Sequence, residues 1–139
     1  MATTAVITLT SDIMPNYGGY SKTMTLTEAG ALTDLKETTG FSRRKLASTS
    51  KVDLFTMELI NPTTTDTITG AKVFIKNIGY NGTIDKAVGV MVFINSQEIG
   101  RLYGGDWLMM PVDTSDGEDI EVKPDTDDAL VLEWVMFYQ

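Results

Sequence analysis

The side chains that could do chemistry in this sequence are carboxylates, and they gather near its C-terminus. The chain of 139 residues contains no histidine and no cysteine. This excludes histidine-based triads, cysteine nucleophiles, and the zinc, haem and iron–sulfur sites that use these ligands. Residues 104–139 contain one basic residue and ten acidic ones: Asp106, Asp113, Asp116, Glu118, Asp119, Glu121, Asp125, Asp127, Asp128 and Glu133.

Carboxylates in pairs could act as acid and base in glycoside hydrolysis, or bind Ca²⁺ through their oxygens. Most of these acids lie in turn-like segments such as residues 113–117 and 124–128, where aspartate bonds to nearby backbone. Neither residues 113–121 nor residues 125–128 have the spacing of an EF-hand loop. We therefore expect solvated loop charge, with a calcium or partner contact as the alternative, and no catalytic residue, no cofactor and no metal site.

Glu133 differs from the other acids because it interrupts an apolar segment, residues 129–138. A partly buried carboxylate needs a cation or backbone donors beside it. Arg101 and Lys51 are the candidate partners. The alternative is a catalytic acid with a raised pKa.

Four cations and no acid occupy residues 41–51: Arg43, Arg44, Lys45 and Lys51. The whole chain has a net charge of −8, which argues against nucleic acid as a partner. We expect the basic stretch, Arg43 to Lys45 above all, to meet an acidic surface built from residues 104–128 of a neighbouring copy, or another acidic protein. The alternative is a solvated loop.

Alternation with a period of two dominates the chain. Apolar residues alternate with polar ones in residues 5–10, 23–27, 72–76 and 119–123, and threonine occurs 20 times. Such segments form strands with one buried face. Turn signals separate them at residues 15–19, 61–66, 79–82, 95–96, 104–105, 113–117 and 124–128. The sequence predicts an all-β protein, a jelly-roll-like β-sandwich of about eight strands. Residues 1–50 would form N-terminal strands and an arm or loop, and residues 51–139 the sandwich core of a single structural domain.

Two segments, residues 87–94 and 129–138, are apolar on both faces and therefore need cover on both. A second subunit or a long loop would provide it. We expect Trp107, Leu132, Trp134 and Met136 at a subunit interface. Trp107 with Tyr103 could instead stack on a sugar ring. No segment is long enough to span a membrane, and the N-terminus lacks the features of a secretory signal.

From about residue 51 the sequence resembles small β-structured virion proteins of tailed bacteriophages, above all capsid decoration or cement proteins. Head–tail connector and tail proteins look similar. The resemblance rests on residues 74–79 (FIKNIG), 92–95 (VFIN), 99–111 (IGRLYGGDWLMMP), 120–124 (IEVKP) and 131–138 (VLEWVMFY). It implies a non-enzymatic protein that binds the major capsid protein, commonly as a homotrimer, on the capsid surface of a virion assembled in the host cytoplasm.

Overall fold

Strands make up all the regular structure in the computed structural model, which describes residues 5–11, 20–26, 28–29, 33–34, 37–55, 71–80, 84, 87–112, 119–127 and 129–138. All strand pairings in these segments are antiparallel. Within the same segments, no helix has the length and apolar character needed to cross a membrane. The abundance of threonine and the period-two alternation account for this preference for strands.

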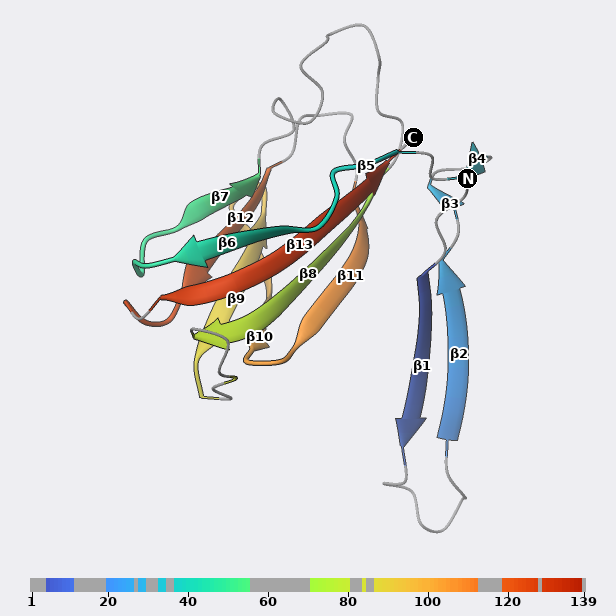
Figure 1. Cartoon of the computed structure of the whole chain (residues 1–139), viewed down its shortest axis with the longest axis horizontal. Coiled ribbons are helices and arrows are strands. Elements are labelled where there is room, and N and C mark those ends of the chain that lie inside the picture. Colours follow the sequence, from blue (N-terminus) through green and yellow to red (C-terminus); the bar gives the residue numbers. More distant parts are fainter. Residues whose placement is uncertain are drawn as a thin grey trace, which may run out of the picture.

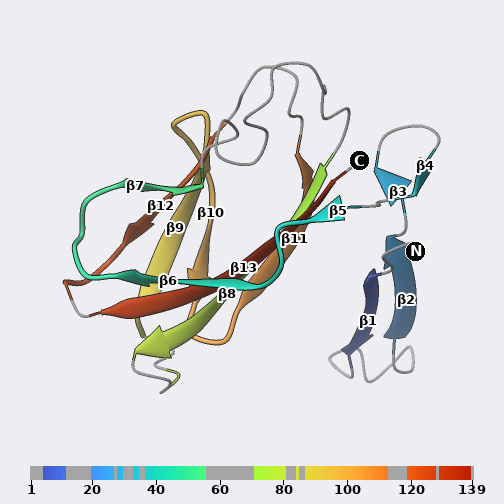
Figure 2. The ribbon, with the colours of Figure 1, turned by 45° about the horizontal axis from the view of Figure 1, so that its top comes forward.

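Two sheets lie face to face (Figures 1 and 2). The first has the order β10 (Gln97–Tyr103), β9 (Gly89–Ile94), β12 (Ile120–Pro124) and β7 (Val52–Phe55). The second begins with β11 (Trp107–Val112), β8 (Ala71–Tyr80) and β13 (Leu130–Tyr138). Its fourth position is shared by β5 (Glu37–Thr38) and β6 (Ser42–Leu46), which both pair with the remaining edge of β13. The predicted all-β sandwich of about eight strands is confirmed.

Four further strands stand outside both sheets. β1 (Ala5–Ser11) and β2 (Tyr20–Leu26) form one hairpin, and β3 (Glu28–Ala29) pairs with β4 (Thr33–Asp34). In Figures 1 and 2 the β1–β2 hairpin lies beside the sandwich. The sandwich itself begins earlier than the predicted boundary at residue 51, because β5 and β6 are strands of the second sheet.

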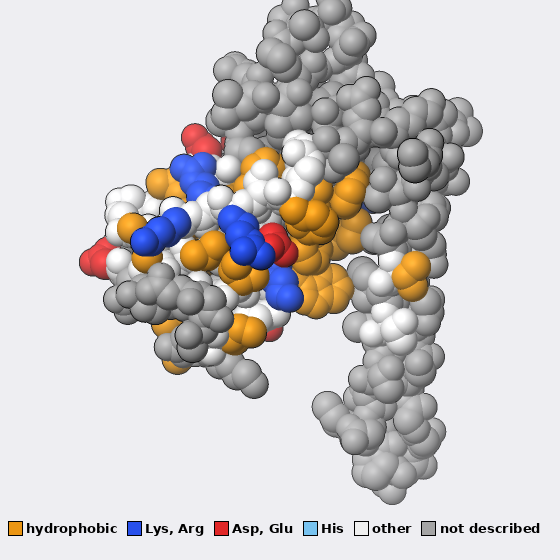
Figure 3. Space-filling view, in the orientation of Figure 1, with side chains coloured by type: hydrophobic (Ala, Val, Ile, Leu, Met, Phe, Trp, Pro, Cys, Tyr) orange, Lys and Arg blue, Asp and Glu red, His pale blue; other side chains and the backbone are white. Residues whose placement is uncertain are grey.

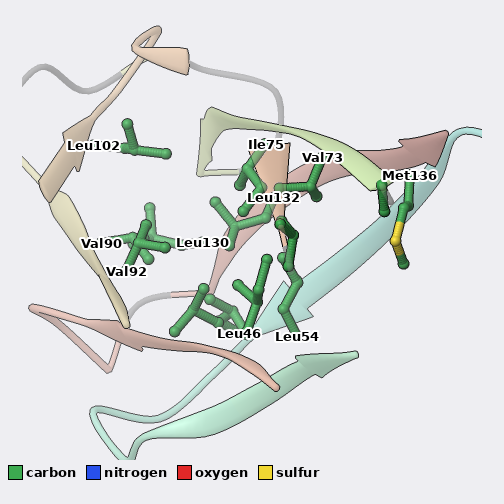
Figure 4. Close-up of a cluster of buried hydrophobic side chains, with 14 residues drawn as sticks. Leu46, Leu54, Val73, Ile75, Val90, Val92, Leu102, Leu130, Leu132 and Met136 are labelled. Atoms are coloured by element: carbon green, nitrogen blue, oxygen red, sulfur yellow. The ribbon is translucent and has the colours of Figure 1, made fainter. Parts of the chain in front are cut away.

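The core fills the space between the two sheets. In the second sheet, Val73 and Ile75 of β8 and Leu130 and Leu132 of β13 point between the sheets, and all four have no exposed surface (Figure 4). The first sheet contributes the alternate residues of its own strands, among them Leu54, Val90, Val92, Leu102, Ile120 and Val122. Strand residues alternate between faces, so the residues between these core positions point to the outer face of their sheet.

Asn77 is the polar exception inside this core. Its side-chain nitrogen donates hydrogen bonds to the carbonyl oxygens of Leu102 (3.0 Å) and Val88 (3.4 Å), and its side-chain oxygen accepts one from the Gly79 backbone (2.9 Å). Next to it, β8 carries one extra residue relative to β13, and Gly79 has the positive φ of 85° that glycine adopts without strain. A fully bonded amide thus connects the two sheets where β8 bulges.

The predicted turn at residues 95–96 connects β9 and β10. Asn95 and Ser96 both have positive φ, 48° and 64°, which is the backbone of a type I′ hairpin turn. The turn predicted at Asn81 and Gly82, and those at residues 15–19, 61–66 and 113–117, lie outside the described residues.

Candidate functional site

Most of the described carboxylates of the C-terminal quarter bond to groups of their own chain. Asp106 Oδ2 accepts from the backbone N–H of Tyr103 (3.0 Å), and Asp127 Oδ1 from that of Thr49 (3.1 Å). Asp125 forms an ion pair with Arg101 (3.2 Å). In the described segments no three acidic side chains lie close enough to hold a metal ion. Asp113, Asp116, Glu118 and Asp128 lie outside those segments.

Glu133 finds its cation in the neighbouring strand. Arg43 of β6 is directly opposite Glu133 of β13, and Arg43 Nε lies 2.9 Å from Glu133 Oε2. Neither of the expected partners is used, because Arg101 pairs with Asp125 and Lys51 with Glu121. The pair lies on the outer face of the second sheet, so Glu133 is not a carboxylate isolated in the core.

Lys51 is held in a small polar cluster on the outer face of the first sheet. Its Nζ lies 2.8 Å from a carboxylate oxygen of Glu121, 3.0 Å from Ser96 Oγ and 5.3 Å from the centre of the Phe93 ring. The hydrogen bond from Lys51 lowers the pKa of the Glu121 carboxyl below its ordinary value of 4.5, and the bonds from Ser96 act in the same direction, while burial opposes them. Lys51 also lies over part of the outer surface of β9, one of the strands predicted to need cover on both faces.

Arg44 closes one open side of the sandwich. Its guanidinium donates to the backbone carbonyl oxygens of Asp53 and Leu54 in β7, the latter at 3.1 Å. β6 and β7 are edge strands of opposite sheets, so this side chain bridges the gap between them. Three cations of the basic stretch, Arg43, Arg44 and Lys51, therefore bond to carboxylates or backbone carbonyl oxygens of their own chain.

A partly exposed aromatic row crosses the outer face of the second sheet. The Phe74 ring of β8 meets the Phe41 ring edge-on, with 6.3 Å between ring centres, and is stacked with the Trp107 ring of β11 at 6.2 Å. Phe41 is 69% exposed and Trp107 is 45% exposed. Met109 is directly opposite Phe74 in the register of β11 and continues the apolar row. These residues form a broad apolar area over the second sheet (Figure 3).

Charged side chains border this row. Lys76 follows Phe74 on the same face of β8, between Trp107 of β11 and Glu133 of β13 in the register. Arg43 and Lys45 project from the same face of β6. Figure 3 shows basic side chains beside the apolar area. We refer to Phe41, Phe74, Trp107, Met109, Arg43, Lys45, Lys76 and Glu133 as the aromatic–basic face.

The residues expected at a subunit interface separate into two groups. Leu132 and Met136 have no exposed surface, because they point between the sheets and pack in the core. Trp134 is partly buried against the same core. These buried side chains cannot reach a partner subunit, which corrects the expectation for Leu132 and Met136. Trp107, by contrast, is open to a partner.

Tyr103 and Trp107 do not form the sugar-stacking pair considered from the sequence. Leu102 and Leu108 both turn toward the core, so Tyr103 lies on the outer face of the first sheet and Trp107 on that of the second. Trp107 instead has Phe74 against its ring. A single flat platform made by this pair is therefore absent from the structure.

Sequence reasoning missed Phe41, Phe74 and Lys76 as members of a surface. The alternation of Val73 and Ile75 with Lys72 and Lys76 also places Phe74 on the outer face, which is the signal that could have found it. No signal in the sequence brings Phe41 to Phe74, because that contact depends on the pairing of β6 with β13.

Comparisons with known proteins add no relative: no family model, no curated protein and no solved structure matches the chain significantly.

Proposed function

We propose that this chain is a structural protein of a tailed-phage virion, which binds the capsid shell as a decoration or cement protein and performs no catalysis. The observation that carries this proposal is the aromatic–basic face, where Phe41 and Trp107 remain exposed on a rigid sheet. Exposed apolar patches of this kind mark sites of protein contact. The resemblance of residues 51–139 to virion proteins supplies the partner, the major capsid protein.

The bonding of the described charges supports a binding role over chemistry. Arg43, Arg44, Lys51 and Arg101 each hold a group of their own chain. Five acidic side chains of the C-terminal quarter are bonded within the chain, three in ion pairs with these cations and two to backbone N–H groups. These groups stabilise the sandwich, so they are not a free acid–base pair of the kind hydrolysis needs. The exposed rings are what this surface offers to another molecule.

The decoration role also implies a location and an assembly state. We place the protein on the capsid surface of the virion, after assembly in the host cytoplasm, as a homotrimer. Repeated sites on a capsid lattice would multiply weak contacts by avidity. Light scattering at micromolar concentration tests the trimer, and a strict monomer would contradict that part of the proposal.

Sedimentation with capsids tests the function itself. Capsids assembled without this protein are mixed with purified protein, pelleted and analysed for bound copies. We expect saturable binding at a copy number that follows the capsid lattice, and slower disruption of the decorated capsids by heat. Absence of the protein from the pellet would overturn the proposal, whereas six or twelve copies per particle would move the protein to the neck or tail.

A carbohydrate-binding module is the candidate from another class. The exposure of Trp107 favours it, because an open indole ring could stack on a sugar. Binding to a glycan array that is lost in Trp107→Ala, without binding to capsids, would select this alternative.

A further inference from the structure

The aromatic–basic face combines an apolar centre with a positively charged border on a protein that is acidic overall. We propose that this face docks onto an acidic protein surface that has an apolar centre. The inference rests on the proposed function, in which the capsid shell presents that acidic surface.

The centre of the face has the anatomy of a binding site for protein. Phe41, Phe74 and Trp107 touch one another in a row on a sheet whose strands are fixed by pairing on both sides of β8. Large aromatic side chains held rigidly in this way supply most of the energy at protein interfaces, because little conformational entropy is lost when they are covered.

The border determines the charge of the partner. Arg43 is neutralised by Glu133, but neither Lys45 nor Lys76 forms an ion pair with any residue that the structure describes. On the outer face of the first sheet, two of the three described cations are paired, Lys51 with Glu121 and Arg101 with Asp125, and only Lys123 forms no ion pair with a described residue. The aromatic–basic face therefore has an excess of positive charge that complements carboxylates on a partner.

The same charge disfavours a two-fold contact between two copies of this face. In a two-fold contact between identical faces, Lys45 and Lys76 of each copy would meet the same cations of the other, and like charges brought together in an interface cost free energy. An acidic surface on a different protein avoids this repulsion.

Single-stranded nucleic acid fits the arrangement of the rings poorly. Bases stack on aromatic faces that stand free. Here the Phe74 and Trp107 rings stack on each other at an interplanar angle of 28°, and Phe41 meets Phe74 at 76°, so the rings do not form a flat platform.

Two matched pairs of variants test the face on capsids assembled without this protein. Lys45→Glu is compared with Lys123→Glu, a lysine of β12 whose register places it on the outer face of the first sheet. Trp107→Ala is compared with Tyr103→Ala, which removes a ring of nearly equal exposure, 45% against 43%, from that same outer face. Circular dichroism and thermal melting verify that each variant is folded. If Lys45→Glu does not fold, Lys76→Gln replaces it as the charge variant.

We expect Lys45→Glu to weaken binding to capsids by about tenfold and Trp107→Ala by tenfold or more, while each control stays within about threefold of wild type. Binding of the wild type is expected to weaken by about tenfold between roughly 50 and 300 mM NaCl, because the border charges are screened. Equal effects in a variant and its control would overturn the docking face but leave the proposed function intact. Failure of the wild type to bind capsids would instead overturn the proposed function.

Two further outcomes would also contradict the inference. A change in oligomeric state caused by Lys45→Glu or Trp107→Ala, measured by analytical ultracentrifugation, would assign the face to contact between copies of this chain. Binding of a fluorescent single-stranded oligonucleotide that both variants abolish would assign the face to nucleic acid.

Discussion

The side-chain nitrogen of Asn77 lies 3.0 Å from the backbone carbonyl oxygen of Leu102, so a fully buried amide of β8 is bonded to β10 in the opposite sheet. The backbone N–H of Asn77 also donates to the carbonyl oxygen of Asp106 (3.0 Å), and its own carbonyl accepts from Gly105 (2.8 Å). One residue thereby fixes the connection from β10 to β11, and with it the strand that carries Trp107.

Replacement of Asn77 by leucine is expected to lower the free energy of unfolding by about 2–4 kcal/mol, because it leaves buried backbone groups of Leu102 and Gly79 without their partner. Chemical denaturation measures the change. Gln97→Ala, which removes an exposed amide in β10, is the control and should change stability by less than about 0.5 kcal/mol. A loss of less than about 1 kcal/mol for Asn77→Leu would mean that the hydrogen bonds of the Asn77 side chain are not essential to the contact between the two sheets.

Two adjacent arginines are expected to differ in their effect on stability. Arg44 donates to two backbone carbonyl oxygens of β7, whereas Arg43 forms one exposed ion pair with Glu133. Arg44→Met should therefore lower the free energy of unfolding by about 1.5–3 kcal/mol, and Arg43→Met by no more than about 1 kcal/mol. Urea denaturation of both variants gives the comparison, and equal losses would show that Arg44 does not close this side of the sandwich.

Two glycines of neighbouring strands offer a test of close packing. A Cβ atom at Gly89 would lie 2.7 Å from Asp125 Oδ2 and 3.0 Å from Arg101 Cδ, whereas a Cβ atom at Gly100 would meet nothing within 4 Å. Gly89→Ala must displace the Arg101–Asp125 pair, so we expect it to be less stable than Gly100→Ala by about 1 kcal/mol or more. Thermal melting of the two variants measures this difference, and the reverse order would contradict the packing described around Gly89.

Acid is expected to weaken the sandwich partly through Glu121. Its pKa in the folded protein lies below the ordinary value of 4.5, so between these two values the unfolded chain binds more protons than the folded one. The stabilisation by the Lys51–Glu121 pair is therefore complete above about pH 4.5 and is lost as the pH falls through the lowered pKa of Glu121. Because the pair is partly exposed, its contribution is about 1 kcal/mol or less.

Glu121→Gln should accordingly be less stable than wild type at pH 7, and the difference should shrink as the pH falls toward 3. Denaturant unfolding at a series of pH values measures the difference. A constant difference over this range would mean that Glu121 has the same pKa in the folded and unfolded chain.

The strands themselves could be predicted because alternation is a local property. Val73 and Ile75 in β8, and Ile120 and Val122 in β12, are buried just as their spacing predicts. The sequence predicts an arm or loop at β6 because its consecutive cations hide the alternation. An edge strand tolerates charge on both sides, and only its pairing with β13 makes it part of the sheet.

The candidate site was harder to predict because its members come together through tertiary pairing. Strand β13 is apolar on both faces, so the sequence could not show that Leu132 and Met136 face the core of their own chain. The same limit applies to charge. The opposite charges of residues 41–51 and the C-terminal quarter predicted attraction, but only the pairing of β6 with β13 shows that Arg43 and Glu133 meet within one chain.

A reconstruction of decorated capsids by cryo-electron microscopy tests the central claim most directly. We expect the sandwich on the outer surface of the shell, with the sheet of β11, β8, β13 and β6 turned toward the capsid protein and Trp107 covered by it. Carboxylates of the capsid protein should lie beside Lys45 and Lys76. Capsids without added density, or a sandwich attached through the opposite sheet with Trp107 open to solvent, would contradict the account.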